Sequence, residues 1–213
     1  MKVKNEETAG RSRRFWITLE VILILILIAV GAFIIATLSA PESSTAEVAE
    51  CISREGGETC IQLPTFTGQT LAGEEVTLPD AFTSEFVLAL IVFNRDQQSR
   101  AEPWLPVVQE MDAAYANLSF YDLALVTDIA PAARLMALGG MRLLMDEELH
   151  DNFVMPFLEN REIFLEALDL PDFETMHVVV MNPAGEVFWR IEGEFTEEKG
   201  DALREQLAQL ITD

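Results

Sequence analysis

The sequence is short of basic residues, cysteine and histidine, and each shortage excludes a class of function. Among 213 residues, 14 Lys and Arg stand against 36 Asp and Glu, which gives a formal net charge of −22. No basic patch is available to neutralise phosphates, so we expect no nucleic-acid partner. The two cysteines and two histidines do not form ligand pairs with the spacing of a zinc site. We therefore expect neither a metal nor a cofactor.

Apolar residues are not scarce, and one long run of them has the length of a membrane span. Half of the chain is apolar, which rules out a disordered acidic tail. Residues 21–40 contain no charge, and an apolar stretch of about 20 residues crosses a bilayer core of ~30 Å. A cleaved signal peptide has a shorter apolar region of about 7–15 residues. We predict an uncleaved transmembrane anchor over residues 15–40, with a cleaved signal as the alternative.

Basic residues before this run predict its orientation. Five cations precede it, namely Lys2, Lys4, Arg11, Arg13 and Arg14. Because Lys and Arg are retained on the cytoplasmic side of a membrane, residues 1–14 are a predicted cytoplasmic tail. The protein then passes once through the plasma (cell) membrane, and its C-terminal domain is extracytoplasmic. Residues 41–213 hold nine cations and 33 acids. This acidic surface is explained either by a salt-adapted host or by docking of a basic partner.

Both cysteines, Cys51 and Cys60, lie in a linker predicted over residues 41–60, which is rich in Pro, Glu, Ser, Ala and Gly. Outside the cytoplasm they meet an oxidising compartment, where disulfides persist. We predict a structural disulfide between them. A redox-active pair is the alternative, although catalytic dithiols usually occur as C-x-x-C at a helix N-terminus.

Hydrophobic periodicity along residues 61–213 predicts one domain in which strands and helices alternate. The continuous apolar run at 86–93 is typical of a strand buried on both faces. Further predicted elements are a helix at 102–116, a strand at 118–126, a helix at 130–138 ended by Gly139 and Gly140, part of a helix at 164–170, a hairpin of strands at 177–181 and 186–191, and a last helix capped by Thr196. This order, β-α-β-α and then β-β-α, predicts an α/β three-layer fold with a mixed sheet, which is the order of the thioredoxin fold.

Several short motifs point to the same fold. They are Leu63-Pro-Thr-Phe66, Leu71-Ala-Gly73, Val76-Thr-Leu-Pro-Asp80 and the hairpin at 178–187. Together they resemble redoxins of the thioredoxin superfamily. In that superfamily a catalytic cysteine follows the strand that ends near Phe93, whereas the predicted loop at 94–100 contains none. Met176 or His177 stands where the superfamily has its cis-proline. We therefore expect no thiol chemistry at this site and no catalytic residue.

Three longer stretches carry a narrower resemblance. They are Arg95-Asp96 with Trp104 and Pro106 beyond, Glu147-Glu-Leu-His150-Asp151, and the segment at 182–198. These are similar to the thioredoxin-like assembly-factor family of the mitochondrial ATP synthase, which helps to mature the membrane sector of that enzyme. The resemblance implies a membrane-protein partner. The residues that we expect to bind it are Arg95, Asp96, Trp104, Pro106, His150 and Asp151.

Residue chemistry leaves alternatives open at these positions. Arg95 either grips a partner's carboxylate, with Asp96 orienting it, or Arg95 and Asp96 form a local ion pair that ties the loop to the following helix. His150 and Asp151 are either a proton-handling pair, or His150 is a hydrogen-bonded histidine at the surface or at the end of a helix. His177 is expected to be a core or edge histidine with its hydrogen bonds satisfied.

A methionine-rich stretch allows two interpretations as well. Met136, Met141, Met145 and Met155 either form an adaptable surface for an apolar partner helix or fill the core.

One hypothesis about function combines these expectations. We predict a membrane-anchored, extracytoplasmic thioredoxin-like domain without redox chemistry, which acts as an assembly or interaction module for membrane proteins. The alternative is a thiol-disulfide oxidoreductase that uses Cys51 and Cys60 as a mobile dithiol. A stalked domain of purely structural use is the third interpretation.

Overall fold

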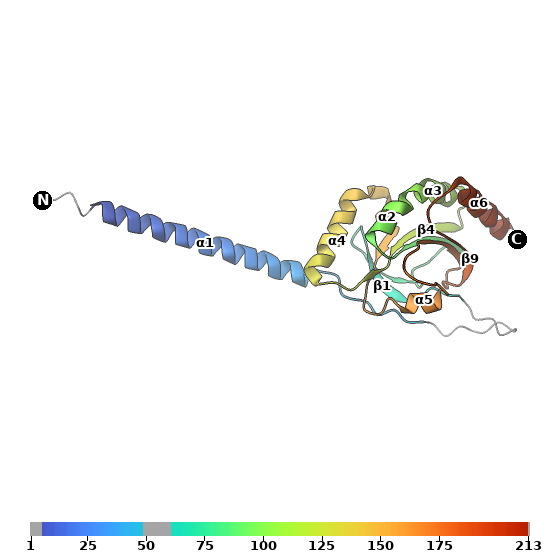
Figure 1. Cartoon of the computed structure of the whole chain (residues 1–213), viewed down its shortest axis with the longest axis horizontal. Coiled ribbons are helices and arrows are strands. Elements are labelled where there is room, and N and C mark those ends of the chain that lie inside the picture. The colour runs from blue at the N-terminus through green and yellow to red at the C-terminus, as the bar shows by residue number, and fades with distance from the viewer. Residues whose placement is uncertain (1–5, 49–60, 213) are drawn as a thin grey trace.

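A computed structural model describes the backbone of residues 6–48 and 61–212, and the side chains of residues 21–35, 37–48 and 61–211. A long helix, α1 (Glu6–Leu38), projects from a globular domain (Figure 1). Its large apolar side chains between Val21 and Leu38 are exposed wherever they are described, by 48% to 82%. Within the described side-chain ranges, no helix is long and apolar enough to cross a membrane.

The segment after α1 lies along the domain. The backbone N–H of Ser44 donates to the carbonyl of Phe157 (2.9 Å), and the N–H of Glu159 donates back to Ser44 (3.1 Å). Glu47 and Thr65 exchange both of their backbone hydrogen bonds (2.8 and 2.6 Å). The structure therefore fixes residues 41–48 to the domain. Cys51 and Cys60 lie outside the described residues, so their disulfide stays a prediction.

A seven-stranded mixed sheet forms the centre of the domain. Its strands, in spatial order, are β2 (Glu75–Leu78), β1 (Phe66–Thr70), β6 (Phe153–Met155), β4 (Leu118–Ala124), β3 (Phe86–Val92), β8 (His177–Met181) and β9 (Val187–Glu192). β6, β4 and β3 are mutually parallel, and every other pairing in this sheet is antiparallel. A separate parallel pair joins β5 (Val126–Thr127) to β7 (Phe157–Leu158).

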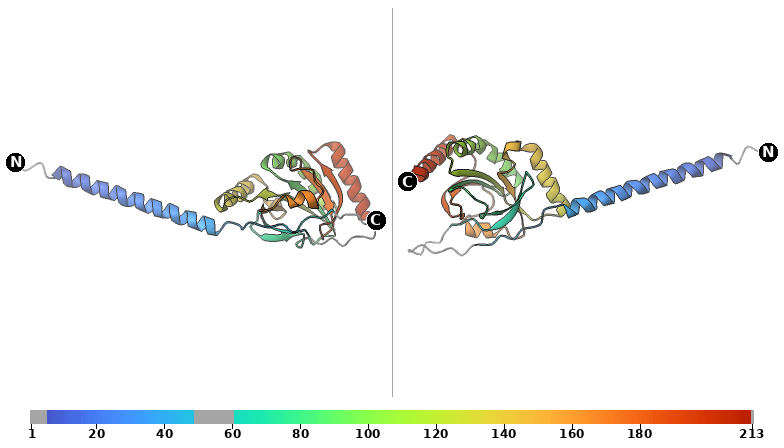
Figure 2. Two further views of the ribbon diagram at one scale, coloured as in Figure 1. Left: turned by 60° about the horizontal axis from the view of Figure 1, so that its bottom comes forward. Right: turned by 180° about the vertical axis from the view of Figure 1, so that it is seen from behind.

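Helices and loops cover both faces of this sheet (Figure 2). The helical elements after α1 are α2 (Arg95–Ala101), η1 (Glu102–Trp104), α3 (Leu105–Ala114), α4 (Pro131–Leu144), η2 (Glu147–Leu149), α5 (Ile163–Ala167) and α6 (Glu197–Thr212). Alternate residues of β3 serve the two sides: Leu88 and Leu90 pack with α2, α3 and α6, whereas Ala89 and Ile91 pack with α5. This double burial explains why the β3 sequence is apolar at every position.

The topology confirms a thioredoxin-like α/β fold with a mixed sheet. The predicted strands at 86–93 and 118–126 are β3 and β4, and the predicted hairpin is β8 and β9 with its turn at Asn182–Gly185. Thr196 caps α6 as expected, because its hydroxyl accepts from the N–H of Lys199 (3.2 Å). The β1–β2 hairpin and β6 are additions that the hydrophobic pattern did not predict.

Two expected boundaries were wrong. The segment at 94–100, expected to be a loop, consists of the N-cap Asn94 followed by helix α2, and the Asn94 side chain accepts from the N–H of Gln97 (3.0 Å). The helix expected to end at Gly139 continues as α4 to Leu144. Its flanking Leu, Met, Ala and Arg residues are strong helix formers, which offsets the cost of about 1 kcal/mol for each glycine.

Candidate functional site

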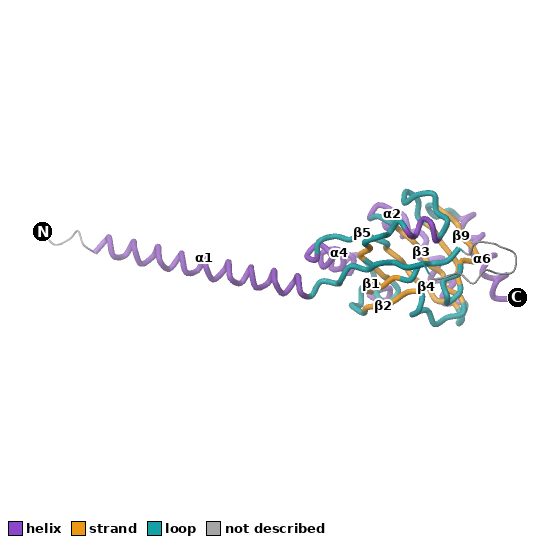
Figure 3. The backbone as a smooth tube through the Cα atoms, turned by 90° about the horizontal axis from the view of Figure 1, so that it is seen from below, coloured by secondary structure: helices purple, strands orange, loops and turns teal. Residues whose placement is uncertain are grey.

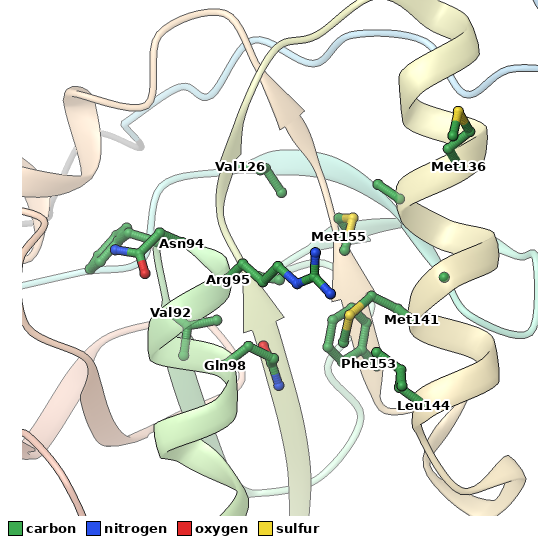
Figure 4. Close-up of a pocket in the computed structure, with 14 residues that line it drawn as sticks. Val92, Asn94, Arg95, Gln98, Val126, Met136, Met141, Leu144, Phe153 and Met155 are labelled. Atoms are coloured by element: carbon green, nitrogen blue, oxygen red, sulfur yellow. The ribbon is translucent and has the colours of Figure 1, made fainter.

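An apolar pocket of about 280 Å³ opens beside the C-terminal end of β3, where a redoxin would carry its catalytic cysteine. Figure 4 shows its two walls, α2 with Arg95 and Gln98 on one side and α4 with Met141 and Leu144 on the other. Phe153 and Met155 of β6 lie between them. Of the described residues that line this pocket, none is Cys, Ser, Thr, His, Asp or Glu. The pocket therefore suits binding and offers no nucleophile or base.

Arg95 is the one charged residue among the described residues that line this pocket. It is the first residue of α2 and is exposed, and its side chain extends toward Phe153 and Met141 (Figure 4). Neither Arg95 nor Asp96 forms an ion pair within the part of the chain that the structure describes, so the local pair between them is not found. Asp96 borders a separate polar depression that it shares with Arg95 and Glu174.

The Gln97 side chain connects the start of α2 to the backbone of two other segments. Its side-chain oxygen accepts from the N–H of Phe93 (2.7 Å), and its amide nitrogen donates to the carbonyl of Phe173 (2.7 Å). The side chain is 2% exposed. It therefore ties the end of β3 to the loop that leads into β8, and it holds one wall of the pocket in place.

A buried acid lies behind the Gln98 wall. Asp122 on β4 is 1% exposed, and one of its carboxyl oxygens accepts from the Gln98 amide (2.8 Å). Neither the other carboxyl oxygen of Asp122 nor the Gln98 carbonyl oxygen has a partner among the described residues. Burial raises the pKa of Asp122 to about 7, and the hydrogen bond from Gln98 lowers it in part. An acid within a strand that was predicted to be buried was the available sequence signal for this site.

The methionines divide between the two expected roles. Met155 is 5% exposed and belongs to the core, whereas Met136 is 78% exposed; both line the pocket. Met141 lines it as well and is half-buried. Met145 packs against the core and does not line the pocket.

The other predicted partner-binding residues lie away from this pocket. Trp104 is fully buried, donates its indole N–H to the carbonyl of Gly193 (3.2 Å) and packs edge-on against Phe195. Pro106 is exposed in the first turn of α3.

His150 and Asp151 lie in the turn before β6. A ring nitrogen of His150 is 3.3 Å from the carbonyl of Met145, and Asp151 is exposed. Of the six residues, Arg95 alone lines the apolar pocket and Arg95 and Asp96 line the polar depression, whereas the other four line neither. The partner-binding role of all six stays a prediction.

His177, the first residue of β8, is in the core but is not hydrogen-bonded as expected. It is 1% exposed, its ring packs edge-on against Phe93, and neither ring nitrogen has a partner among the described residues. Burial lowers the pKa of His177, and Arg190 adds to this effect, while Glu192 and Asp172 oppose it. The peptide bond directly before β8, between Met176 and His177, is not cis; the cis bond in the described part of the chain is Leu78–Pro79, which follows β2.

No protein-family model matches the chain, and no curated protein matches it. Among solved structures, it is similar to the thioredoxin domain of a thiol-disulfide oxidoreductase from Bacteroides vulgatus (TM-score 0.46, 20% identity, 71% of this chain and 99% of that one). It is also similar to a thiol:disulfide interchange protein from Bacteroides sp. (0.47, 20%, 73% and 91%).

A third similar structure is BsSco, a member of the Sco family of cytochrome c oxidase assembly proteins (TM-score 0.45, 15% identity, 68% of this chain and 91% of that one). The activities in these names belong to those proteins. For this chain, the sheet order and connectivity described above define the class, a thioredoxin-like domain.

Proposed function

We propose that this protein is a membrane-anchored, extracytoplasmic thioredoxin-like domain without redox chemistry, which binds an apolar segment of a membrane protein as an assembly or interaction module. One observation carries the proposal. The pocket at the usual position of the redoxin thiol is lined mostly by apolar residues, with Asn94, Arg95 and Gln98 as its polar ones, and by no nucleophile or base among the described residues.

The exposed side chains of α1 support the anchor. Apolar groups in water are unfavourable by roughly 25 cal/mol per Å² of exposed area, and Val21, Leu27 and Leu38 are 51%, 63% and 82% exposed. A bilayer around the uncharged run at 21–40 removes that cost. The five cations before the run support a cytoplasmic N-terminus and an extracytoplasmic domain in the cell membrane.

The chemistry of the pocket supports a particular kind of occupant. Methionine side chains are flexible and polarizable, so Met136 and Met141 can adapt to differently shaped apolar groups. Arg95 is a cation without an ion-pair partner among the described residues, and guanidinium pairs readily with carboxylate. The favoured occupant is an apolar segment that carries Asp or Glu. The resemblance to ATP synthase assembly factors supports the membrane sector of an ATP synthase as the first partner to examine.

Photo-crosslinking in native membranes tests this function. The full-length protein carries p-benzoylphenylalanine in place of Met141, which lines the pocket, or in place of exposed Glu198 on α6 as a control. We expect adducts from position 141, and not from position 198, with an apolar acidic segment of a membrane protein that mass spectrometry identifies.

Two glycines provide matched pocket variants. Gly140 lines the pocket and Gly139 does not, and a Cβ at either position meets no atom within 4 Å. Gly140→Leu is therefore expected to abolish the adduct and Gly139→Leu to preserve it. An adduct that survives Gly140→Leu contradicts binding in the pocket. Insulin reduction by the wild type that is lost in Cys51→Ser would favour the oxidoreductase alternative instead.

A further inference from the structure

Exposed large apolar side chains of the domain gather on one helix. Over residues 61–211 they are Met136, Leu143, Leu144 and Phe188, and the first three belong to α4. Leu143 is 89% exposed and Leu144 is 72% exposed. Met136 and Leu143 are seven residues apart, so they lie on the same side of the helix, two turns from each other. Apolar side chains that gather on one exposed surface in this way mark a contact with a partner or a membrane.

This helix begins where α1 ends. The two helices are in contact, and the guanidinium of Arg134 donates to the carbonyl of Pro41 (2.5 Å), three residues beyond α1. The same buried guanidinium forms an ion pair with Asp128 (2.6 Å). Figures 1 and 3 show α4 at the side of the domain that α1 enters, and in Figure 1 it runs across the direction of α1.

The charge pattern of α4 differs from that of the rest of the domain. Residues 131–144 contain Arg134 and Arg142 and no acid, although the chain as a whole carries 36 Asp and Glu. Acidic residues resume at Asp146, directly after the helix. This helix, which is in contact with α1, is thus free of the carboxylates that hydrate other surfaces of the domain.

We propose that α4 lies on the outer surface of the lipid bilayer, with Met136, Leu143 and Leu144 inserted at the boundary between headgroups and acyl chains. The inference rests on the proposed membrane anchor. If α1 crosses the bilayer, its last residue, Leu38, is at the outer surface, and so is Pro41 just beyond it. Helix α4 then starts at the same level and runs along this surface. An interfacial helix buries its apolar side in this way and keeps its remaining sides in water or against protein.

The occupant is lipid because the apolar surface of α4 continues that of α1. Insertion is driven by apolar area and not by charge, since the acids after Leu144 repel anionic headgroups. Binding to the bilayer is therefore expected in zwitterionic phosphatidylcholine and is expected to be insensitive to salt. The pocket shares Met136 and Leu144 with this surface, so its mouth opens next to the membrane, where an apolar partner segment would leave the bilayer.

Spin-label depth measurements on the full-length chain test the proposal. Single labels are placed at Leu143→Cys, at Glu198→Cys as a control on α6, and at Val30→Cys within α1, in a Cys51→Ser, Cys60→Ser background. The protein is reconstituted in phosphatidylcholine vesicles, and collision with oxygen is compared with collision with a water-soluble nickel complex. We expect the label at 143 to collide more with oxygen, as at 30, and the label at 198 to collide more with nickel.

The outcomes separate the two proposals. A label at 30 that meets the nickel complex overturns the anchor, and the α4 inference with it. A label at 30 in lipid with one at 143 in water overturns the α4 inference alone. A label at 143 that is shielded from both reagents shows that protein covers α4, which also overturns it. If the cysteine-free background does not fold, p-benzoylphenylalanine at 143 in the unaltered cysteine background reports the same contact, as lipid adducts or as their absence.

Discussion

The side-chain amide of Gln98 donates a 2.8 Å hydrogen bond to the carboxyl group of Asp122, which is buried in the centre of the sheet. Gln98 also lines the pocket, so the buried acid and the candidate binding surface share one side chain. The second carboxyl oxygen has no partner among the described residues. A carboxylate in this position is poorly solvated, and the raised pKa of Asp122, about 7, follows from that burial.

Asp122→Asn is expected to remove one component of the pH dependence of stability. Because the folded pKa of Asp122 is raised from 3.8 to about 7, the unfolded chain loses its proton first as pH rises. The wild type therefore loses stability from about pH 4 to pH 7, by at most about 4 kcal/mol. The variant lacks this loss and is more stable than the wild type at pH 8 by denaturant unfolding in detergent. Gln98→Ala removes the hydrogen bond that lowers the pKa of Asp122, so in this variant the loss of stability should continue to higher pH than in the wild type. A dependence of stability on pH that is the same in all three proteins contradicts this account.

His177→Leu is expected to remove a component of the pH dependence of stability that has the opposite sign. The pKa of His177 is lowered in the folded protein, chiefly by burial. The unfolded chain takes up its proton first, and stability contributed by His177 is lost as pH falls below about 6.5. The leucine variant should not lose this stability at acidic pH. The substitution breaks no hydrogen bond, because neither ring nitrogen has a partner in the described chain.

The two buried groups can be separated in one experiment. Between about pH 4.5 and 6.5 the stability of Asp122→Asn should rise with pH and that of His177→Leu should fall, with the wild type between them. Unfolding curves for the three proteins at several pH values measure these slopes. Parallel slopes would show that neither burial is energetically important.

Gln97→Ala is expected to lower the free energy of unfolding by about 2–4 kcal/mol. The substitution leaves the N–H of Phe93 and the carbonyl of Phe173 without their buried partner, and each such group costs about 1–3 kcal/mol. Ser99→Ala, two residues further along the same helix and exposed, is the control and should change stability by less than about 0.5 kcal/mol. Equal stabilities for the two variants would refute the role of Gln97 as a backbone tie.

Two glycines should respond oppositely to alanine. A Cβ on Gly68 would lie 2.7 Å from a methyl carbon of Val154 and 3.1 Å from the backbone nitrogen of Pro156. Gly68→Ala is therefore expected to destabilise the protein by about 1–3 kcal/mol. At Gly139 a Cβ meets nothing within 4 Å, so Gly139→Ala is expected to stabilise α4 by up to about 1 kcal/mol. Thermal unfolding of both variants would test the close approach of β1 and β6.

Sequence patterns predicted the elements whose burial is uniform. β3 and β8 are apolar at nearly every position because both of their faces are covered, and Thr196 carries the local signal for α6. Short elements were missed: β2 has one buried residue, and β6 has three residues in all, too few to form a recognisable pattern although each of them is buried. Asn94 was an available capping signal for α2, but the absence of an apolar stripe in residues 95–100 concealed the helix.

The candidate site was predictable only in part. Arg95 follows a buried strand in the sequence, so its place at the end of the sheet could be inferred. The pocket could not, because it depends on α4 standing opposite α2, a relationship between segments about 40 residues apart. Likewise Trp104 belongs to the core because Phe195 and Gly193 fold back onto it, which no local pattern reveals.

The hydrogen bonds of residues 41–48 and of Arg134 have a mechanical consequence for a protein held at a membrane. A domain on a free flexible stalk sweeps through many orientations and heights. Here the chain contacts its own domain at Pro41 and Ser44, directly after α1, so an anchored α1 would hold the domain rigidly. The pocket beside Arg95 would then keep a fixed orientation and a fixed height above the bilayer. Encounter with a membrane-embedded partner would then depend on lateral diffusion of the two proteins in the membrane and not on the length of a flexible linker.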